Sequence, residues 1–418
     1  MRFTSFLLNA ALAAAAALPS IDIDIAKRQA PGAPTKLLVG VPNSVLLVDF
    51  DGISFNIVAN ATEAGTNPSW LAFREPNLLY AVDEFNAVTK LFVLGRDSNT
   101  LQPVQNAAGS AGVVHLEFNL DKTRLVGTSF GAGTIDIWDI TDGTLRLLKQ
   151  IASDDPLGPN ANRQEAPHPH QSVLDPSGRF FVVNDLGTDT LLVIDSQNDQ
   201  FEVVNRVRVA PDGCGPRHGA FFPRGAQAAT HYILLCELLN IVEVFQVTYV
   251  ENSIQFVPTQ VLSSFGQDLP PANATTSTAG EIIVSSDNRD VYVSNRNTGN
   301  QTDTITHFRV NVPTVEGGPI SLDFSESISS GGTVPRMFSL SGDENLLFST
   351  NQNDGFGLIA LARNGNNLAV QGAGDVAASA DFNAAVEAAG TLVSSPVAAL
   401  GVDAFGGPNA GPQFAMQI

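Results

Sequence analysis

The feature that most constrains this chain is an internal repeat of strand-rich units. Units of about 45 to 60 residues recur from Leu37 onward, and a period in this range is typical of propellers and other repeat architectures. Several units begin with a similar short sequence motif, the opening motif, which is followed by a turn and an apolar strand. It lies at residues 67–73, 169–174, 215–221 and 334–338. The 418 residues can therefore form one large all-β domain.

The clearest unit shows the strand pattern of one blade. Its opening motif is followed by the turn Asp175-Pro176-Ser177-Gly178-Arg179, an apolar strand at 180–183, a second turn at 185–189 and another strand at 190–194. Six blades are predicted from unit openings near Pro68, Val113, Pro169, Pro216, Ala279 and Pro335. Strands at 37–39, 45–49 and 55–59 supply three strands of a seventh. We therefore predict an all-β fold, a seven-bladed β-propeller.

The fourth strand of the N-terminal blade is predicted near the C-terminus of the chain. Residues 395–400 (Ser-Pro-Val-Ala-Ala-Leu) repeat the opening motif and are the candidate inner strand. Pairing of the N- and C-terminal strands would close the ring and remove exposed sheet edges. The propeller is thus expected over 37–403, with an irregular tail at 404–418, while the Ala-rich stretch 377–389 fits a short helix or a loop.

The N-terminus has the pattern of a targeting segment. Residues 1–19 combine a charged start with a short apolar stretch and are predicted to be a signal peptide. Residues 20–36 follow as a leader containing the dibasic pair Lys27-Arg28, either a processing site or a solvated pair. No later segment has eighteen consecutive apolar residues, so no membrane anchor is predicted. Acceptor triplets for N-glycosylation begin at Asn60, Asn273 and Asn300. The protein is therefore expected to be secreted, with association to the cell wall as a variant.

Charge and motifs exclude several classes of partner. The net charge of −20 argues against nucleic acid, which needs a basic surface, and an anionic substrate would need a local arginine cluster. The chain lacks zinc-ligand spacing and a phosphate-binding GxxxxGK loop, so we expect no metal and no cofactor. Cys214 and Cys236 are the only cysteines and lie near the ends of neighbouring strands. An oxidising compartment favours a disulfide between them over two free thiols.

Alignment of the blades places four polar residues at one end of the channel. His170 and Arg217 occupy the same position at the start of the inner strand in neighbouring blades. Glu237 and Arg296 share a position at the end of the second strand. Guanidinium groups hold carboxylate or phosphate oxygens, while His and Glu exchange protons. These residues are the catalytic candidates, and the alternative is an ordinary polar channel mouth.

Four more residues are secondary candidates for substrate binding. His168 lies two residues before His170, so it either lines the channel or belongs to a loop. His218 and Glu281 follow the inner-strand position by one residue and should point elsewhere, because side chains alternate along a strand. Arg336 occupies the position of Arg217 in another blade, where it contacts substrate or, more simply, bonds backbone carbonyls between blades.

These motifs resemble the lactonase family of propellers, which includes bacterial-type 6-phosphogluconolactonases and the eukaryotic 3-carboxy-cis,cis-muconate lactonizing enzyme, a carboxymuconate cyclase. The resemblance is carried by residues 167–170, 175–179, 185–189, 215–218, 292–296 and 335–338 with 351–352. It implies that His170, Arg217, Glu237 and Arg296 correspond to the family's proposed catalytic residues, with the arginines holding carboxylates or phosphate and His170 and Glu237 moving protons.

The resemblance leaves the reaction open. It implies an anionic small molecule, a lactone or its open-chain acid, which the protein either cyclises or hydrolyses. Two alternatives use the same fold without turnover, namely a propeller that binds a small molecule and a secreted or cell-wall glycoprotein that acts as an adhesin or antigen.

Overall fold

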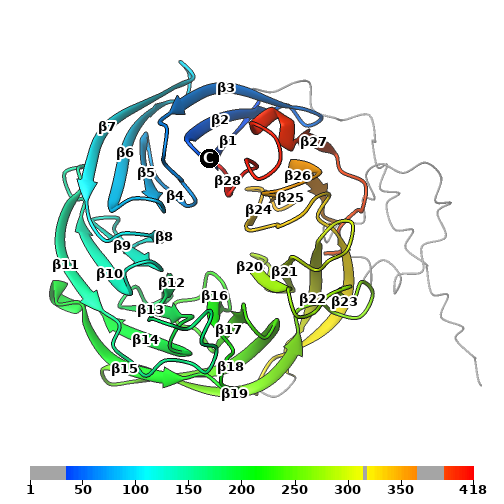
Figure 1. The fold of residues 1–418 in the computed structure, drawn as a ribbon. Helices are drawn as coiled ribbons and strands as arrows, with labels where there is room; N and C mark the ends of the chain where they lie inside the picture. Colours follow the sequence, from blue (N-terminus) through cyan, green and yellow to red (C-terminus); the bar gives the residue numbers. More distant parts are fainter. Residues whose placement is uncertain (1–33, 314–317, 365–389) are drawn as a thin grey trace, which may run out of the picture. The chain divides into compact units, whose positions relative to one another are not determined.

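A computed structural model describes residues 34–313, 318–364 and 390–418, which form one compact unit from Pro34 to Ile418. This unit is a ring of seven four-stranded antiparallel sheets, the blades, arranged around a central axis (Figure 1). The predicted fold class, an all-β seven-bladed propeller, is confirmed. The signal peptide at 1–19, most of the 20–36 leader and the Ala-rich stretch 377–389 lie outside the described residues.

Each blade is a meander of four strands, which are named below in their order from the axis outward. Blade 1 consists of β28 (Phe414–Gln417), β1 (Thr35–Val41), β2 (Ser44–Phe50) and β3 (Phe55–Thr62). Blade 2 consists of β4 (Leu71–Arg74), β5 (Leu78–Asp83), β6 (Val88–Gly95) and β7 (Thr100–Ala108). Blade 3 consists of β8 (Val113–Phe118), β9 (Arg124–Ser129), β10 (Thr134–Asp139) and β11 (Arg146–Ala152). Blade 4 consists of β12 (Pro169–Leu174), β13 (Phe180–Asp185), β14 (Thr190–Asp195) and β15 (Glu202–Arg208).

The second half of the chain continues the pattern. Blade 5 consists of β16 (Pro216–Phe222), β17 (His231–Cys236), β18 (Ile241–Val250) and β19 (Ser253–Ser263). Blade 6 consists of β20 (Thr278–Val284), β21 (Asp290–Arg296), β22 (Thr304–Asn311) and β23 (Ser321–Ser329). Blade 7 consists of β24 (Phe338–Leu340), β25 (Leu346–Thr350), β26 (Phe356–Ala362) and β27 (Ala398–Gly401). Short 3-10 segments occur at η1 (Gln197–Asp199) and η2 (Val402–Phe405). Among the described residues, no helix has the length and apolar character needed to cross a bilayer.

The ring is closed by a different strand from the one expected. Residues 395–400 were predicted to be the inner strand of blade 1, but β27 pairs with β26 as the outermost strand of blade 7. The inner strand is β28, which pairs antiparallel with β1 and lies inside the tail that was expected to be irregular. Burial explains the choice, because Phe414 and Ala415 are buried whereas Val397 is exposed. Closure by the two terminal strands is nevertheless confirmed.

Apolar contacts between neighbouring sheets hold the blades in place. The second and third strands of blade 4 are buried along nearly their whole length, whereas its outermost strand β15 alternates exposed and half-buried residues. One cluster joins Val182 and Leu191 of blade 4 to Tyr232 and Leu234 of blade 5. Because packed interiors deform little, such clusters fix the relative positions of the inner strands.

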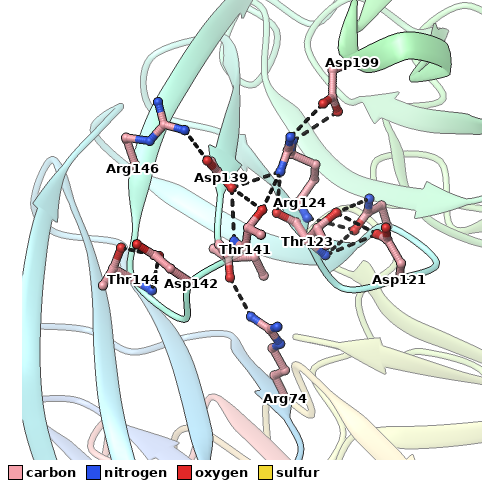
Figure 2. A network of polar contacts seen from close by, with 12 residues as sticks. Arg74, Asp121, Thr123, Arg124, Asp139, Thr141, Asp142, Thr144, Arg146 and Asp199 are labelled. Carbon is pink, nitrogen blue, oxygen red and sulfur yellow. Dashed lines mark hydrogen bonds and ion pairs between the residues drawn. The ribbon is translucent and has the colours of Figure 1, made fainter.

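Ion pairs tie the blades together at the rim where the second strands begin. Arg124, the first residue of β9, binds Asp139 of its own blade at 2.9 Å and Asp199 of blade 4 at 2.6 Å (Figure 2). Arg74 of blade 2 donates to the carbonyl of Ile140 in blade 3 (Figure 2). The inner strands start at the opposite rim.

The two cysteines form a disulfide, as predicted, with a Cα–Cα distance of 5.2 Å. It joins the residue before Gly215 to the last residue of β17. Of the three glycosylation triplets, Asn60 and Asn273 are exposed, while Asn300 is half-buried and donates a hydrogen bond to the carbonyl of Pro270. Glycosylation stays a prediction.

Candidate functional site

The site begins with a β-bulge that recurs at the start of several inner strands. In blade 5, Pro216 pairs with Cys236 and His218 with Leu235, so Arg217 has no partner across the ladder. The same register shift leaves His170 unpaired in blade 4 and Val114 unpaired in blade 3, and in blade 6 it lies between Ala279 and Ile282. A bulge adds one residue and re-aims side chains. His170 and Arg217 thus occupy equivalent positions.

The bulge also corrects one expectation. His218 and Glu281 were expected to point elsewhere because side chains alternate along a regular strand. The bulge breaks this alternation, so Arg217 and His218 both line the channel mouth, and Glu281 reaches across from blade 6 to His218. The expected orientation of His218 was therefore wrong, whereas Glu281 contacts His218 without itself lining the hollow.

Glu237 is the centre of a group of guanidinium side chains that we call the arginine cluster. Its Oε2 accepts a hydrogen bond from Nε of Arg217 at 3.0 Å and pairs with Nη2 of Arg296 at 2.8 Å. Its Oε1 pairs with Arg163, which comes from the loop before β12. Arg217 also donates to the carbonyl of Gly280, and Arg296 to that of Ala279. Blades 5 and 6 and the blade 4 loop meet here.

The backbone fixes Glu237 at this point. Its N–H donates to the carbonyl of Gly215 at 2.8 Å, so the ends of β16 and β17 stay together. The disulfide lies immediately before both residues, because Cys214 precedes Gly215 and Cys236 precedes Glu237. The crosslink therefore clamps the two segments that carry Arg217 and Glu237.

The electrostatics of the cluster favour an anionic ligand. Burial alone would raise the pKa of Glu237, but the guanidinium groups of Arg296, Arg217 and Arg163 outweigh it and lower the pKa to about 2. Burial and the neighbouring Arg296 lower the pKa of Arg217, with Glu237 opposing them, and the guanidinium remains charged at neutral pH. Positive charge therefore exceeds negative charge locally, against the protein's overall charge of −20.

A small hollow lies beside the arginine cluster, at the axis of the ring. Its lining combines aromatic, imidazole and guanidinium groups from blades 2, 3, 4 and 5, the segment before β24 and the residue before β28: Ser69, Trp70, Val114, His170, Arg217, His218, Arg336, Met337 and Gln413. The rings of His170 and His218 are 5.0 Å apart between centroids. Among the described residues, Nδ1 of His170 and Nε2 of His218 are buried without a hydrogen-bond partner, and both side chains line the hollow.

The imidazoles of the hollow are uncharged at neutral pH. Burial and, after it, the positive charge of Arg217 lower the pKa of His170 and of His218 well below the ordinary value. Burial likewise lowers the pKa of His115, whose ring centroid lies 4.2 Å from that of Trp70 in a tilted contact and 5.8 Å from that of His218 in an edge-on contact. Neutral imidazoles can accept protons.

The remaining secondary candidates separate. His168 packs on the ring of Phe130 at 4.0 Å, its Nδ1 lies 2.7 Å from the Phe130 carbonyl oxygen, and it does not line the hollow. Arg336 does line the hollow, and it bridges blades through a 2.9 Å ion pair with Glu84 rather than through backbone carbonyls.

Sequence reasoning missed several residues of the site. Trp70 lies within an opening motif and His115 within an aligned blade, so the blade alignment contained a signal for both. Arg163 lies in an irregular loop, and Gln413 depends on the closing strand that was not anticipated. Neither has a periodic pattern around it that could have placed it.

Comparison with known proteins supports the architecture. Residues 35–373 match the family model described as Lactonase, 7-bladed beta-propeller. A probable 6-phosphogluconolactonase of Arthroderma benhamiae is 31% identical over 61% of this chain and 64% of its own length, so the match spans less than two thirds of that relative. A 6-phosphogluconolactonase of Bacillus subtilis is 27% identical over 69% of this chain and 78% of its own length.

Solved structures show the same fold. A periplasmic gluconolactonase of Pseudomonas aeruginosa superposes with a TM-score of 0.70 at 21% identity, covering 92% of this chain and 99% of that chain. At this identity the likeness concerns the fold.

Proposed function

Since this chain belongs to the lactonase family of seven-bladed β-propellers, we propose that it is a hydrolase that opens a lactone ring on an anionic small molecule. The observation that carries the proposal is the excess of guanidinium groups around the hollow, beside two imidazoles with unpartnered nitrogens. The names of the Arthroderma and Bacillus relatives are consistent with it.

The arginines supply binding and charge stabilisation. A guanidinium has five N–H donors, and the bonds of Arg217 and Arg296 to Glu237 and to backbone carbonyls do not use all of them. The free donors can hold a carboxylate or phosphate of the substrate. They can also stabilise the negative charge that develops on the carbonyl oxygen when water attacks a lactone.

Proton transfer belongs to the imidazoles. The sequence-based prediction gave it to His170 and Glu237 together. Both carboxylate oxygens of Glu237 already bind guanidinium groups, which lower its pKa to about 2, so this carboxylate is occupied in holding the arginines. We therefore assign Glu237 the role of holding the three guanidinium groups, and His170 contact with the substrate through its free Nδ1.

The proposal is tested by turnover of defined lactones. Purified protein is incubated near neutral pH with δ-gluconolactone, its 6-phosphate ester and a carboxylated muconolactone, and acid release is followed with the spontaneous rate subtracted. We expect acceleration of an anionic lactone. Arg217→Gln should raise KM or lower kcat by about 10- to 100-fold, the value of one charge-assisted hydrogen bond.

The matched control is Arg146→Gln, which removes an exposed arginine at the opposite rim. It should leave turnover unchanged. A folded wild-type protein that accelerates none of these lactones would overturn the proposed function.

We also propose that the protein works outside the cell. The disulfide between Cys214 and Cys236 supports this, because such bonds persist in oxidising compartments, and so does the signal-like pattern of residues 1–19. Expression in a fungal host with N-terminal sequencing of the secreted protein should find a mature start at Gln29. Retention in the cell with residues 1–28 intact would contradict it.

A further inference from the structure

We propose that His218 and Glu281 form the proton-transfer pair of the hollow, with His218 as the base that activates water. The inference rests on the lactone opening proposed above and deepens it, because it assigns the proton to residues outside the set of His170, Arg217, Glu237 and Arg296.

The geometry has three parts. Nδ1 of His218 lies 2.8 Å from Oε1 of Glu281, and the two residues are only 2% and 3% exposed. The same Oε1 accepts a hydrogen bond from the backbone N–H of Ile282 at 3.0 Å. Nε2 of His218 is buried without a hydrogen-bond partner in the part of the chain that the structure describes, and His218 lines the hollow with Arg217 and His170.

These contacts determine which ring nitrogen carries the hydrogen. When Glu281 is ionised, its Oε1 can only accept hydrogen bonds, from the backbone N–H of Ile282 and from Nδ1 of His218, so Nδ1 then carries the hydrogen and donates it. The lone pair of Nε2 is then free to accept a proton in the hollow. A carboxylate behind Nδ1 also stabilises the imidazolium formed when Nε2 takes a proton.

The other candidate groups lack this arrangement. Glu237 is bound by three guanidinium groups. His168 does not line the hollow. His170 does, but among the described residues it forms no ion pair with a carboxylate, so no such group sets its tautomer. His218 is thus the imidazole of the hollow that has both an orienting carboxylate and an unpartnered nitrogen.

Charged groups from every neighbouring blade act on the pair. The charged groups are Arg217 beside His218 on β16, Glu237 after β17, Arg296 on β21 and Arg336 before β24, and the titratable imidazoles of His115 on β8 and His170 on β12 also face the pair. Burial lowers the pKa of His218, and the three arginines add to the effect. Burial raises the pKa of Glu281 above its ordinary range although Arg217 and Arg296 oppose it.

A pH dependence follows. When Glu281 holds a proton, an imidazolium at His218 lacks its counter-charge, so the base is weak. When Glu281 ionises, the imidazolium is stabilised and Nε2 becomes a stronger base. Because the pKa of Glu281 is raised, the rate should increase with pH through an inflection above the ordinary carboxyl pKa of about 4.3.

The reaction balances with these groups and water. Nε2 of His218 accepts a proton from water while the water oxygen bonds to the lactone carbonyl carbon, and the carbonyl electron pair moves to its oxygen, beside Arg217. The tetrahedral intermediate collapses, the ring C–O bond breaks, and the leaving alkoxide takes the proton from Nε2. The product is the open hydroxy acid, and His218 is returned neutral.

The decisive variants are His218→Gln and Glu281→Gln, with His168→Gln as the matched control at a buried imidazole outside the hollow. His218→Gln should lower kcat by about 10²- to 10⁴-fold, the usual range for a general base, with little change in KM. Glu281→Gln keeps an acceptor oxygen for Nδ1 but cannot ionise, so it should lower kcat and remove the inflection from the pH–rate profile. His168→Gln should retain both kcat and the inflection.

A measurement without substrate completes the test. Nitrogen-15 labelling of the six histidines reports by NMR which nitrogen of His218 carries hydrogen. Hydrogen on Nδ1 with an unprotonated Nε2 supports the pair even if no lactone is turned over, in which case only the proposed function fails. Hydrogen on Nε2 overturns the pair. Wild-type turnover with full kcat in a folded His218→Gln protein also overturns it and leaves the lactonase proposal standing.

Discussion

Replacing Glu237 by Gln tests the arginine cluster. The substitution keeps the size and shape of the side chain but removes its negative charge. Arg217, which is 2% exposed, and the half-buried Arg296 would then lie beside Arg163 without the carboxylate that now neutralises them. Because a buried unpaired charge is costly, we expect a large loss of stability as well as of activity.

Two estimates of the magnitude agree. Removing one partner of a buried ion pair costs about 3 to 5 kcal/mol. Independently, the pKa of Glu237 falls from 4.5 to about 2, and at about 1.4 kcal/mol per pH unit this corresponds to about 3 to 4 kcal/mol. We therefore expect Glu237→Gln to lower the free energy of unfolding by about 3 kcal/mol at neutral pH.

The sign of the pH dependence follows from the lowered pKa. A carboxyl whose pKa is lower in the folded protein stabilises the fold above its unfolded pKa of about 4.3, and this stabilisation is lost as the pH falls through about 2. The difference between wild type and Glu237→Gln should therefore be full at neutral pH and shrink progressively below about pH 4.

The assay is urea unfolding followed by the fluorescence of Trp70 and Trp138. The control is Asp154→Asn, which removes a carboxylate that is 76% exposed and paired with Arg206, and which should cost at most about 1 kcal/mol. A loss in Glu237→Gln no larger than in this control, or one that does not shrink in acid, would refute the electrostatic reasoning.

Three further predictions concern closure, crosslinking and binding. The double variant Cys214→Ser/Cys236→Ser removes a crosslink with a sequence separation of 22 and should lower the free energy of unfolding by about 3 kcal/mol, measured in urea; a midpoint equal to that of the oxidised wild type would contradict this. Deleting residues 414–418 removes β28 and the buried ring of Phe414, so the protein should lose at least about 3 kcal/mol and aggregate through the freed edge of β1, and an unchanged monomer in light scattering would disprove it. Arg336→Gln should raise KM for an anionic lactone about tenfold while leaving a neutral lactone unaffected, and equal effects on both would count against a binding role.

The sequence predicted the blades well because their signal is local. Val113, Pro169 and Pro216 were taken as unit openings, and they are the first residues of β8, β12 and β16. Apolar runs bounded by Gly, Asp and Asn turns have the same pattern in every blade, so the repeat reinforces each assignment. Register inside a blade then follows from the pattern of burial.

The bulge and the ring closure could not be predicted in the same way. One extra residue in a strand has no clear sequence signature, so the strand alternation placed His218 wrongly. The closing strand is only four residues long, and both 395–400 and 414–417 are short and largely apolar. The choice between them is made by tertiary burial, which brings Phe414 beside Leu38 and Met337.

Some residues of the site could be predicted from the local strand pattern, and others could not. Arg217, Glu237 and Arg296 were placed by counting from strand ends, and the structure brings them into direct contact. Arg163 completes the cluster from a loop whose path depends on contacts distant in sequence. Residues supplied by irregular loops are thus the part of the site that needs a structure.

The most direct test of lactone hydrolysis at this site follows the oxygen of water. Wild-type protein opens an anionic lactone in ¹⁸O-labelled water, and the product is analysed by mass spectrometry, with the spontaneous reaction and Arg217→Gln measured alongside. We predict one labelled oxygen in the new carboxylate, formed faster than spontaneously by the wild type and much more slowly by the variant. An unlabelled, unsaturated acid formed by elimination, or no acceleration by the folded protein, would contradict it.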